Sequence, residues 1–166
     1  MSAKVSINMV VRNGEKYVRH CLDAILTQAY PHELIELNIL DNNSSDRTKE
    51  VIKNAAQEFR NAGFAKFHLA ESDENMGMWP GQDELLKHSN GKYILVMAVD
   101  VMLDKNFVSK AVGRMESDGN IGALEAKLYR YELSNGNILP SKIIDTCGFK
   151  IFKSRRVINI GHGEED

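Results

Sequence analysis

The sequence has very little cysteine: only Cys21 and Cys147 in a chain of 166 residues. The two lie far apart and match neither a disulfide framework nor the ligand spacing of a zinc site. We therefore expect both thiols to be reduced and buried, with Cys21 on a helix face. Reduced thiols are typical of a reducing compartment, so we expect a cytoplasmic location.

Long apolar runs and a strong charge of one sign are also missing. No stretch approaches the roughly 20 apolar residues of a membrane span, and we expect no signal peptide in the N-terminal segment MSAKVS. The formal net charge is only −2. A dedicated nucleic-acid binder would carry a broad basic field, so we expect no nucleic-acid partner.

What is present is the composition of a folded globular chain. Apolar residues make up 43% and charged residues 27%, which argues against disorder. The length is that of one ordinary domain and is enough to bury a core. We find no internal repeat and no clear linker.

Hydrophobic periodicity predicts alternating strands and helices as far as residue 128. The predicted strands are Lys4–Val11, Ile35–Leu40, Phe67–Ala70, Tyr93–Ala98 and Ile121–Leu128. The predicted helices are Glu15–Gln28, Thr48–Asn61, Asp83–His88 and Lys105–Glu116, with a loop over Glu71–Gln82. This alternation predicts an α/β fold: a doubly wound, mostly parallel sheet flanked by helices.

The pattern weakens after residue 128. Leu133–Pro140 is interpreted as a hairpin or an excursion from the sheet. Two short β segments are expected within Ile143–Ile160.

The strand Tyr93–Ala98 is expected at the centre of the sheet, because its apolar run suits burial on both faces. Asp100 follows the strand directly. Ligands of open α/β sheets bind outside the carboxyl ends of the strands, and an aspartate there can hold a cation that holds phosphate. A loop aspartate that merely ends the strand is the simpler alternative.

Polar residues end three of the predicted core strands: Arg12-Asn13, Asp41-Asn42 and Asp100. We expect these ends to meet in one groove, although ordinary turn chemistry also places Asn and Asp after strands. The first strand-to-helix turn, VVRNGEKYV, lacks G-x-G-x-x-G, and the chain has no Walker A loop. Neither dinucleotide binding by that motif nor a P-loop is therefore expected.

Three blocks of sequence resemble the family 2 glycosyltransferases with the GT-A fold. They are VSINMVVRNGEKYVRHCLDAILTQ, LNILDNNSSDRTKEVI and NMGMWPGQDELLKHSNGKYILVMAVDVMLDKNFV, in the order and spacing of the family over about residues 4–110. The rhamnosyltransferase-like branch is the most similar. The resemblance implies one GT-A (Rossmann-like) nucleotide-sugar-binding domain over 1–166, with an α/β core at 1–128 and the start of an acceptor-side region at 129–166.

The resemblance also implies roles for individual residues. It places Val10, Val11 and Arg12 along the pocket for the nucleotide base. It makes Asp41 and Asn42 hydrogen-bond partners of the base or ribose. It assigns Asn75 and Gly77 to a loop that closes over the nucleotide.

Asp100 corresponds in this resemblance to the last aspartate of the family's D-x-D motif, which binds Mn or Mg that bridges the diphosphate. Ala98 stands at the first position of that motif. We therefore expect weak metal binding until the nucleotide supplies phosphate oxygens.

The implied function is transfer of a sugar from a UDP-, dTDP- or GDP-sugar to a hydroxyl of a glycan or lipid-linked acceptor, in cell-surface polysaccharide synthesis. The carboxylate base of an inverting enzyme is expected beyond Asp166, so we expect a fragment truncated on its acceptor side and inactive alone. The terminal Glu164, Glu165 and Asp166 are interpreted as a solvated charge run. Two alternatives are a non-catalytic transferase-like module for binding or assembly, and a nucleotidyltransferase.

Two hypotheses concern larger partners. Apolar surface left uncovered by truncation would favour a homo-oligomer. Arg155-Arg156 are candidates for contact with a phosphate or with an anionic surface at the inner face of the membrane.

Overall fold

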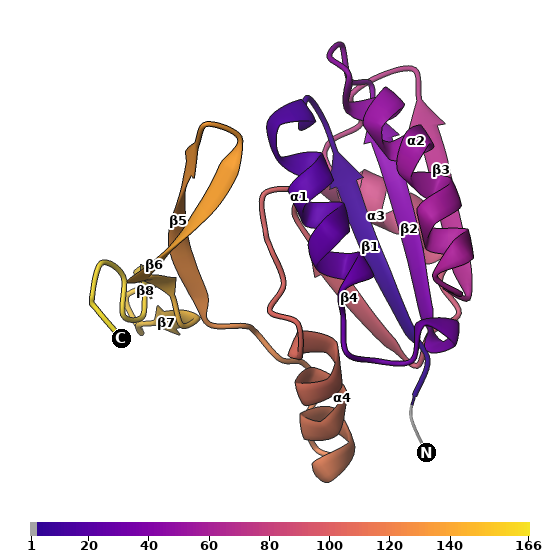
Figure 1. The fold of residues 1–166 in the computed structure, drawn as a ribbon. Coiled ribbons are helices and arrows are strands. Elements are labelled where there is room, and N and C mark those ends of the chain that lie inside the picture. The colour runs from indigo at the N-terminus through magenta and orange to yellow at the C-terminus, as the bar shows by residue number, and fades with distance from the viewer. Residues whose placement is uncertain (1–2) are drawn as a thin grey trace. The chain divides into compact units, whose positions relative to one another are not determined.

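The computed structural model describes residues 3–166, which form two compact units. Within the described residues, the N-terminal unit comprises residues 3–116 and the C-terminal unit residues 117–166 (Figure 1). This division falls before residue 128, which is the predicted end of the α/β core. The assignment of 1–166 to a single domain stays a prediction.

The N-terminal unit contains a four-stranded sheet in the order β3-β2-β1-β4, and all three strand pairs are parallel. The strands are β1 (Val5–Val11), β2 (Ile35–Asn42), β3 (Lys66–Ser72) and β4 (Tyr93–Met97). The helices are α1 (Glu15–Leu26), α2 (Thr48–Asn61), α3 (Met78–Leu86) and α4 (Phe107–Ser117), with a short 3-10 helix at His32–Leu34.

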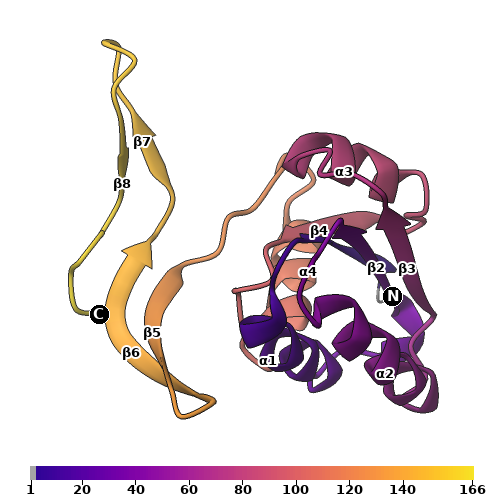
Figure 2. The same ribbon diagram turned by 90° about the horizontal axis from the view of Figure 1, so that it is seen from above.

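Helices cover both faces of this sheet. Figure 2 shows α1 and α2 on one face and α3 on the other. Every residue of β1 and β2 is buried, as expected of parallel strands covered on both sides. The predicted doubly wound α/β architecture is therefore confirmed.

The main core lies between the sheet and helices α1 and α2. In α1, Val18, Cys21, Leu22 and Ile25 are buried at helical spacing. Burial, together with the negative charge of Asp100, raises the pKa of the Cys21 thiol to about 12. Cys21 is free and buried as predicted, whereas Cys147 is free but exposed, so its predicted burial is wrong.

Helix α3 begins at Met78, five residues before the predicted start, so the prediction of a loop as far as Gln82 is wrong. Pro80 is tolerated because it falls in the first turn, where a backbone N–H is not needed. Gly81 is buried, and an added Cβ would lie 2.9 Å from Cγ2 of Val10 and 3.0 Å from Cδ2 of Leu40. The glycine thus lets α3 lie close on the sheet.

Strand β4 lies at an edge of the sheet, so its predicted central position is wrong. Its side chains alternate between a covered and an uncovered face: Met97 is buried, whereas Ile94 and Val96 are 39% and 48% exposed. An apolar run therefore marks this strand correctly but does not establish burial on both of its faces.

The C-terminal unit consists of two antiparallel hairpins, β5 (Leu128–Ser134) with β6 (Asn137–Thr146) and β7 (Phe149–Ile151) with β8 (Val157–Asn159). Asn135 and Gly136 form the first turn with positive φ values of 49° and 77°, as two-residue hairpin turns require. The hairpin predicted around Leu133–Pro140 is confirmed. The strand predicted over Ile121–Leu128 is wrong, because β5 only begins at Leu128.

None of the helices in the described part of the chain has the length and apolar character needed to cross a bilayer.

Candidate functional site

A pocket of about 500 Å³ opens at the carboxyl ends of β1, β2 and β4. Pockets for small ligands usually measure about 300–1,000 Å³. It is lined by Val10, Arg12, Asn13, Gly14, Tyr17, Asn42, Asn75, Gly77, Met78, Ala98, Val99 and Asp100. The ends of three neighbouring strands therefore meet in one groove with the loop that precedes α3.

Six of the eight predicted site residues line this pocket: Val10, Arg12, Asn42, Asn75, Gly77 and Asp100. Val11 and Asp41 do not. The structure thus assembles most of the predicted set, while the ligand roles of these residues stay predictions.

Val11 and Asp41 are directed away from the pocket because side chains alternate along a strand. Val10 and Leu40 pair across β1 and β2 and pack against α3 through Leu85. Their neighbours Val11 and Asp41 pair with each other and must face the opposite side, where Val11 joins the main core.

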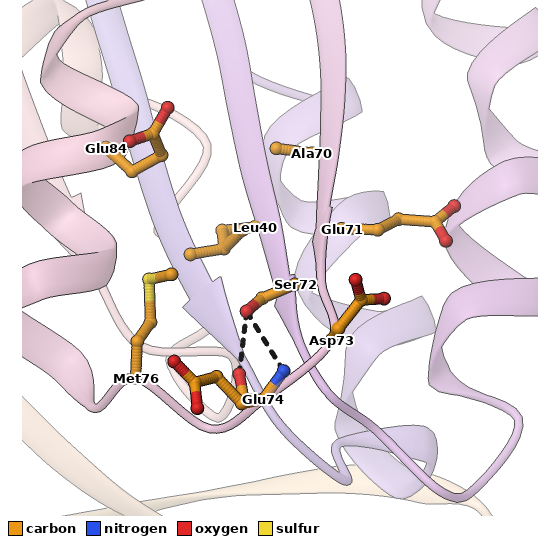
Figure 3. Close-up of a pocket in the computed structure, with 8 residues that line it drawn as sticks. All are labelled: Leu40, Ala70, Glu71, Ser72, Asp73, Glu74, Met76 and Glu84. Atoms are coloured by element: carbon orange, nitrogen blue, oxygen red, sulfur yellow. Dashed lines mark hydrogen bonds between the residues drawn. The ribbon is translucent and has the colours of Figure 1, made fainter.

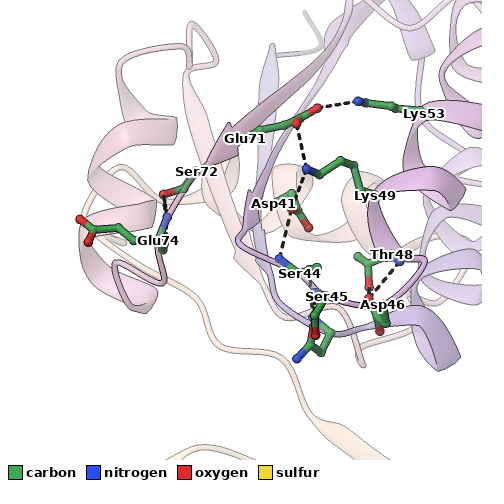
Figure 4. Close-up of polar contacts among 11 residues, drawn as sticks. Asp41, Ser44, Ser45, Asp46, Thr48, Lys49, Lys53, Glu71, Ser72 and Glu74 are labelled. Atoms are coloured by element: carbon green, nitrogen blue, oxygen red, sulfur yellow. Dashed lines mark hydrogen bonds and ion pairs between the residues drawn. The ribbon is translucent and has the colours of Figure 1, made fainter.

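Asp41 instead holds the start of helix α2, as Figure 4 shows. It is fully buried, accepts a hydrogen bond from the Ser44 N–H at 3.3 Å, and has an oxygen 3.9 Å from Nζ of Lys49. The Lys49 amine also lies 3.0 Å from Glu71, which is 2.7 Å from Nζ of Lys53. Hydrogen bonds from the side chains of Lys53 and, to a smaller extent, Lys49 lower the pKa of Glu71. The position of Asp41 therefore favours a structural role.

Asn42 fixes the loop that borders the pocket. Its side-chain amide donates to Oδ1 of Asn75 at 3.0 Å and to the Gly77 carbonyl at 3.3 Å. Its Oδ1 accepts from the Met76 N–H at 3.0 Å. Because this side chain is almost fully committed to the loop, Asn42 shapes the pocket through Asn75 and Gly77.

Helix α3 starts at the pocket wall. Gly77, just before the helix, has a φ of 86°, a left-handed conformation that glycine adopts without strain. Met78, the first residue of the helix, lines the pocket. The positive end of the helix dipole is therefore close to the groove, where it favours negative charge.

The turn after β1 forms another wall and is bonded to the turn after β2. The Asn13 N–H donates to Oγ of Ser44 at 3.0 Å, and the Ser45 N–H donates to Oδ1 of Asn13 at 2.9 Å. Gly14 packs so closely that an added Cβ would lie 2.9 Å from Val11 and 3.1 Å from Val99. The hydrogen bonds therefore join the turns after β1 and β2, and the packing of Gly14 against Val99 brings the segments after β1 and β4 together.

Sequence reasoning missed Gly14, Tyr17, Met78 and Val99 as lining residues. Tyr17 lies in the first turn of α1, so its position after a strand end was the signal that could have found it. Met78 directly follows Gly77, which was predicted for the site, so its place in the same loop was the signal that could have found it.

Asp100 is exposed and is the one carboxylate among the residues that line the pocket. Within residues 3–166, no group of three or more His, Cys, Asp or Glu side chains is placed to hold a metal ion. A single carboxylate fits a divalent cation that takes its other ligands from phosphate and water. It does not fit a permanently bound metal.

A second, larger pocket of about 590 Å³ lies between β3 and α3 (Figure 3). It is lined by Glu71, Asp73, Glu74 and Glu84 over a floor of Leu40, Ala70 and Met76, with Ser72 alongside. Oγ of Ser72 donates to the Glu74 carbonyl at 2.7 Å. Glu71 is paired with Lys49 and Lys53 of α2, but Asp73, Glu74 and Glu84 still disfavour phosphate, so this pocket is the weaker candidate for a nucleotide despite its size.

Residues 6–163 match the family model described as "Glycosyl transferase family 2". The chain belongs to this family. Two relatives illustrate the similarity of this family 2 chain. The glycosyltransferase AglE of Haloferax volcanii is 25% identical over 115 residues, covering 69% of this chain and 36% of that protein. The poly(ribitol-phosphate) beta-glucosyltransferase of Bacillus spizizenii is 24% identical over 165 residues, covering 91% and 25%.

Solved structures show that the fold of this family 2 chain is that of GT-A glycosyltransferases. The mannosyltransferase PcManGT of Pyrobaculum calidifontis, in complex with GDP-Man and Mn2+, matches with a TM-score of 0.68 at 21% identity over 74% of this chain and 34% of its own. S. aureus TarS 1-349 with UDP-GlcNAc matches with a TM-score of 0.61 at 18% identity, over 77% and 39%.

The chain spans only 36% and 25% of the length of the two relatives named above. The rhamnosyltransferase-like branch stays a prediction.

Proposed function

We propose that the pocket at the ends of β1, β2 and β4 binds the nucleoside diphosphate of a sugar donor, together with a divalent cation. The sugar is then transferred to an acceptor hydroxyl in glycan or polysaccharide synthesis. The observation that carries this proposal is the convergence of Arg12, Asn75, Gly77 and Asp100 on one groove. The donors named in the structures of PcManGT and TarS support it.

The pocket offers a different chemistry on each side. Val10 and Tyr17 provide apolar surface for a base, and Arg12 provides a guanidinium. The loop of Asn75 and Gly77, fixed by Asn42, shapes the side next to α3. The start of α3 favours the negative charge of a diphosphate.

Asp100 is the residue that would hold the cation. When bound, a divalent cation neutralises the charge that develops on the leaving diphosphate and orients it. Asp100 is the one carboxylate that lines the pocket, and this proposal assigns it to the cation. The proposal therefore covers the donor site, while the general base for the acceptor hydroxyl, the acceptor and the cytoplasmic location stay predictions.

Isothermal titration calorimetry with UDP, GDP and dTDP, each with and without Mn2+, tests the proposal. We expect one nucleotide to bind with an affinity that rises when Mn2+ is present. Asp100→Ala should lower the Mn2+-dependent affinity by about tenfold or more, because it removes the carboxylate ligand of the cation. Affinity without metal should hardly change.

Asp83→Ala is the matched control, since Asp83 is an exposed carboxylate on α3 that does not line the pocket. It should leave all affinities unchanged. Absence of heat with every nucleotide would overturn the donor site. A loss in Asp100→Ala that is equal with and without Mn2+ would overturn the metal role. Preference for nucleoside triphosphates would favour a nucleotidyltransferase.

A further inference from the structure

The hairpin of β7 and β8 in the C-terminal unit, whose backbone Figure 2 shows, carries several exposed apolar side chains. We call residues Phe149–Asn159 the basic hairpin. Phe149, Ile151 and Val157 are 57%, 73% and 53% exposed. Ile151 pairs directly with Val157 and Phe149 with Asn159, so the three apolar side chains share one face of the ribbon. A contiguous exposed apolar face of this kind marks an interaction surface.

The same hairpin carries a concentrated positive charge. Its four cations are Lys150, Lys153, Arg155 and Arg156, and residues 146–163 contain no Asp or Glu. All residues from 149 to 157 are exposed. None of the four cations forms an ion pair with a carboxylate of residues 3–166. This stands out in a chain whose net charge is −2.

The base of the basic hairpin is firmly bonded, so these side chains are displayed on ordered backbone. The Cys147 N–H donates to the Ile160 carbonyl and the Ile160 N–H to the Gly148 carbonyl, both at 2.9 Å. Oγ1 of Thr146, which is buried, accepts from the Gly148 N–H at 3.0 Å. A two-stranded ribbon with an uncovered apolar face gains stability when a surface covers it.

We propose that the basic hairpin docks on the surface of a bilayer that contains anionic phospholipids. Phe149, Ile151 and Val157 enter the boundary between headgroups and acyl chains, while the four cations contact lipid phosphates. Clusters of at least four Lys or Arg are the usual signature of binding to anionic lipid. Stable peripheral attachment also needs a second, apolar contribution, and the hairpin supplies both. The attachment is independent of donor binding.

Other occupants fit the hairpin less well. An acidic protein or a nucleic acid would use the cations but leave the apolar face in water. A second copy of the chain, related by two-fold symmetry, would cover the apolar face but bring like charges together. A charged bilayer surface satisfies the two features at once.

Vesicle sedimentation of the full chain tests the docking. The vesicles are made of phosphatidylcholine alone or of phosphatidylcholine with 30% phosphatidylglycerol. We expect binding to the anionic vesicles only, weakened by high salt. Lys153→Gln/Arg156→Gln should lower the partition coefficient by roughly tenfold or more, at about fivefold per charge. Phe149→Ser/Ile151→Ser should lower it by at least about tenfold through lost apolar burial.

Two control variants match these changes. Lys16→Gln/Lys105→Gln removes two exposed cations elsewhere, and Leu139→Ser removes an apolar side chain that is 49% exposed on the other hairpin. Both should bind like the unchanged protein. Thermal unfolding should be the same for all variants, because every altered side chain is exposed.

Three results would overturn the docking. The first is no binding to anionic vesicles. The second is full binding by Phe149→Ser/Ile151→Ser, which indicates attraction by charge alone, as for an acidic protein or nucleic acid. The third is a dimer that forms without lipid and is absent in Phe149→Ser/Ile151→Ser, which indicates that a second copy of the chain covers the apolar face.

Discussion

The two ends of the parallel sheet in the N-terminal unit both carry polar residues but use them in opposite ways. At the amino ends, the carboxylate of Glu36 is 2% exposed and fully engaged. It accepts hydrogen bonds from Oγ of Ser6 at 2.7 Å and the Asn90 N–H at 2.9 Å, and it pairs with Nζ of Lys4 at 2.5 Å. At the carboxyl ends, Asp100 and Arg12 are exposed in the candidate pocket.

This difference teaches that the amino edge of the sheet is a closed, stabilising network, whereas the proposed binding site lies at the opposite edge. The amino-end network closes the turn before β4: the Gly91 N–H donates to Oγ of Ser6 at 2.9 Å, and an added Cβ on Gly91 would lie 2.5 Å from the Ser6 nitrogen. At Gly91 the turn therefore lies directly against the backbone of β1. At the carboxyl edge Asp41 and Asn42 are buried, but Arg12 and Asp100 stay at a surface, where a ligand can reach them.

Glu36→Ala is the strongest test of this comparison. Removing the carboxylate leaves Ser6, Asn90 and the Lys4 amine without a shared partner, so we expect the free energy of unfolding to fall by about 3 kcal/mol. Urea unfolding followed by circular dichroism measures this loss. Glu33→Ala, which removes an exposed carboxylate nearby, should change stability by less than about 0.5 kcal/mol. Equal losses in the two variants would contradict a special role for the amino edge.

The contribution of the Glu36 carboxylate to stability should depend on pH. Burial alone raises the pKa of Glu36, but the hydrogen bonds from Lys4, Asn90 and Ser6 outweigh it and lower the pKa from 4.5 to about 2. The ionised form is therefore favoured in the folded state. Its contribution to stability is present above pH 4.5 and is lost as the pH falls toward 2.

We expect this carboxylate to account for a loss of about 2 kcal/mol between pH 6 and pH 3. Other carboxylates titrate in that range, so the measured quantity is the difference between the unfolding curves of the unchanged protein and of Glu36→Gln, which cannot ionise there. A difference that does not vary with pH would show that the charge of Glu36 is unimportant.

Asn42→Ala should give the smallest effect on stability and should act at the opposite edge. It removes the three hydrogen bonds that hold the loop of Asn75 and Gly77. If the pocket binds a nucleotide, its affinity should fall by about tenfold, because the loop must then be ordered on binding. The free energy of unfolding should fall by only about 1 kcal/mol.

Calorimetry and urea unfolding together measure both quantities for Asn42→Ala. Asn54→Ala, at an exposed position of α2, should alter neither. A large loss of stability with unchanged affinity would contradict the proposed difference between the two edges, because Asn42 would then serve stability alone.

The sequence predicted the sheet well because burial dominates the strands. β1 and β2 have apolar residues at least at every second position as far as Leu40 and are joined by a helix, so their position and parallel pairing follow from the pattern. The sequence placed α3 badly because Gly77, Pro80 and Gly81 are typical of loops. The contact of Gly81 with Val10 and Leu40 that makes the helix possible is tertiary and invisible in a local window.

Part of the candidate site could be predicted from where the strands end. The spacing of polar strand ends found Arg12 and Asp100, because parallel strands end at one edge. The prediction placed Val11 and Asp41 on the wrong face of the sheet. The two-residue alternation of side chains along a strand could have separated them from Val10 and Asn42. The amino-end network was missed altogether. Its only signal was an acidic residue, Glu36, inside an apolar strand opposite Ser6.

The turns after β1 and β2 have a consequence for how the molecule opens. Helices α1 and α2 each begin without a cap from their own N-cap residue. Side chains at one start serve the backbone of the other: Thr48 and Asp46 accept from the N–H groups of Gly14 and Glu15, and Glu15 accepts from the N–H of Arg47. When the first turn of one helix frays, the first turn of the other loses hydrogen-bond partners. Amide protons in both first turns should therefore exchange with solvent in concert, as one cooperative unit.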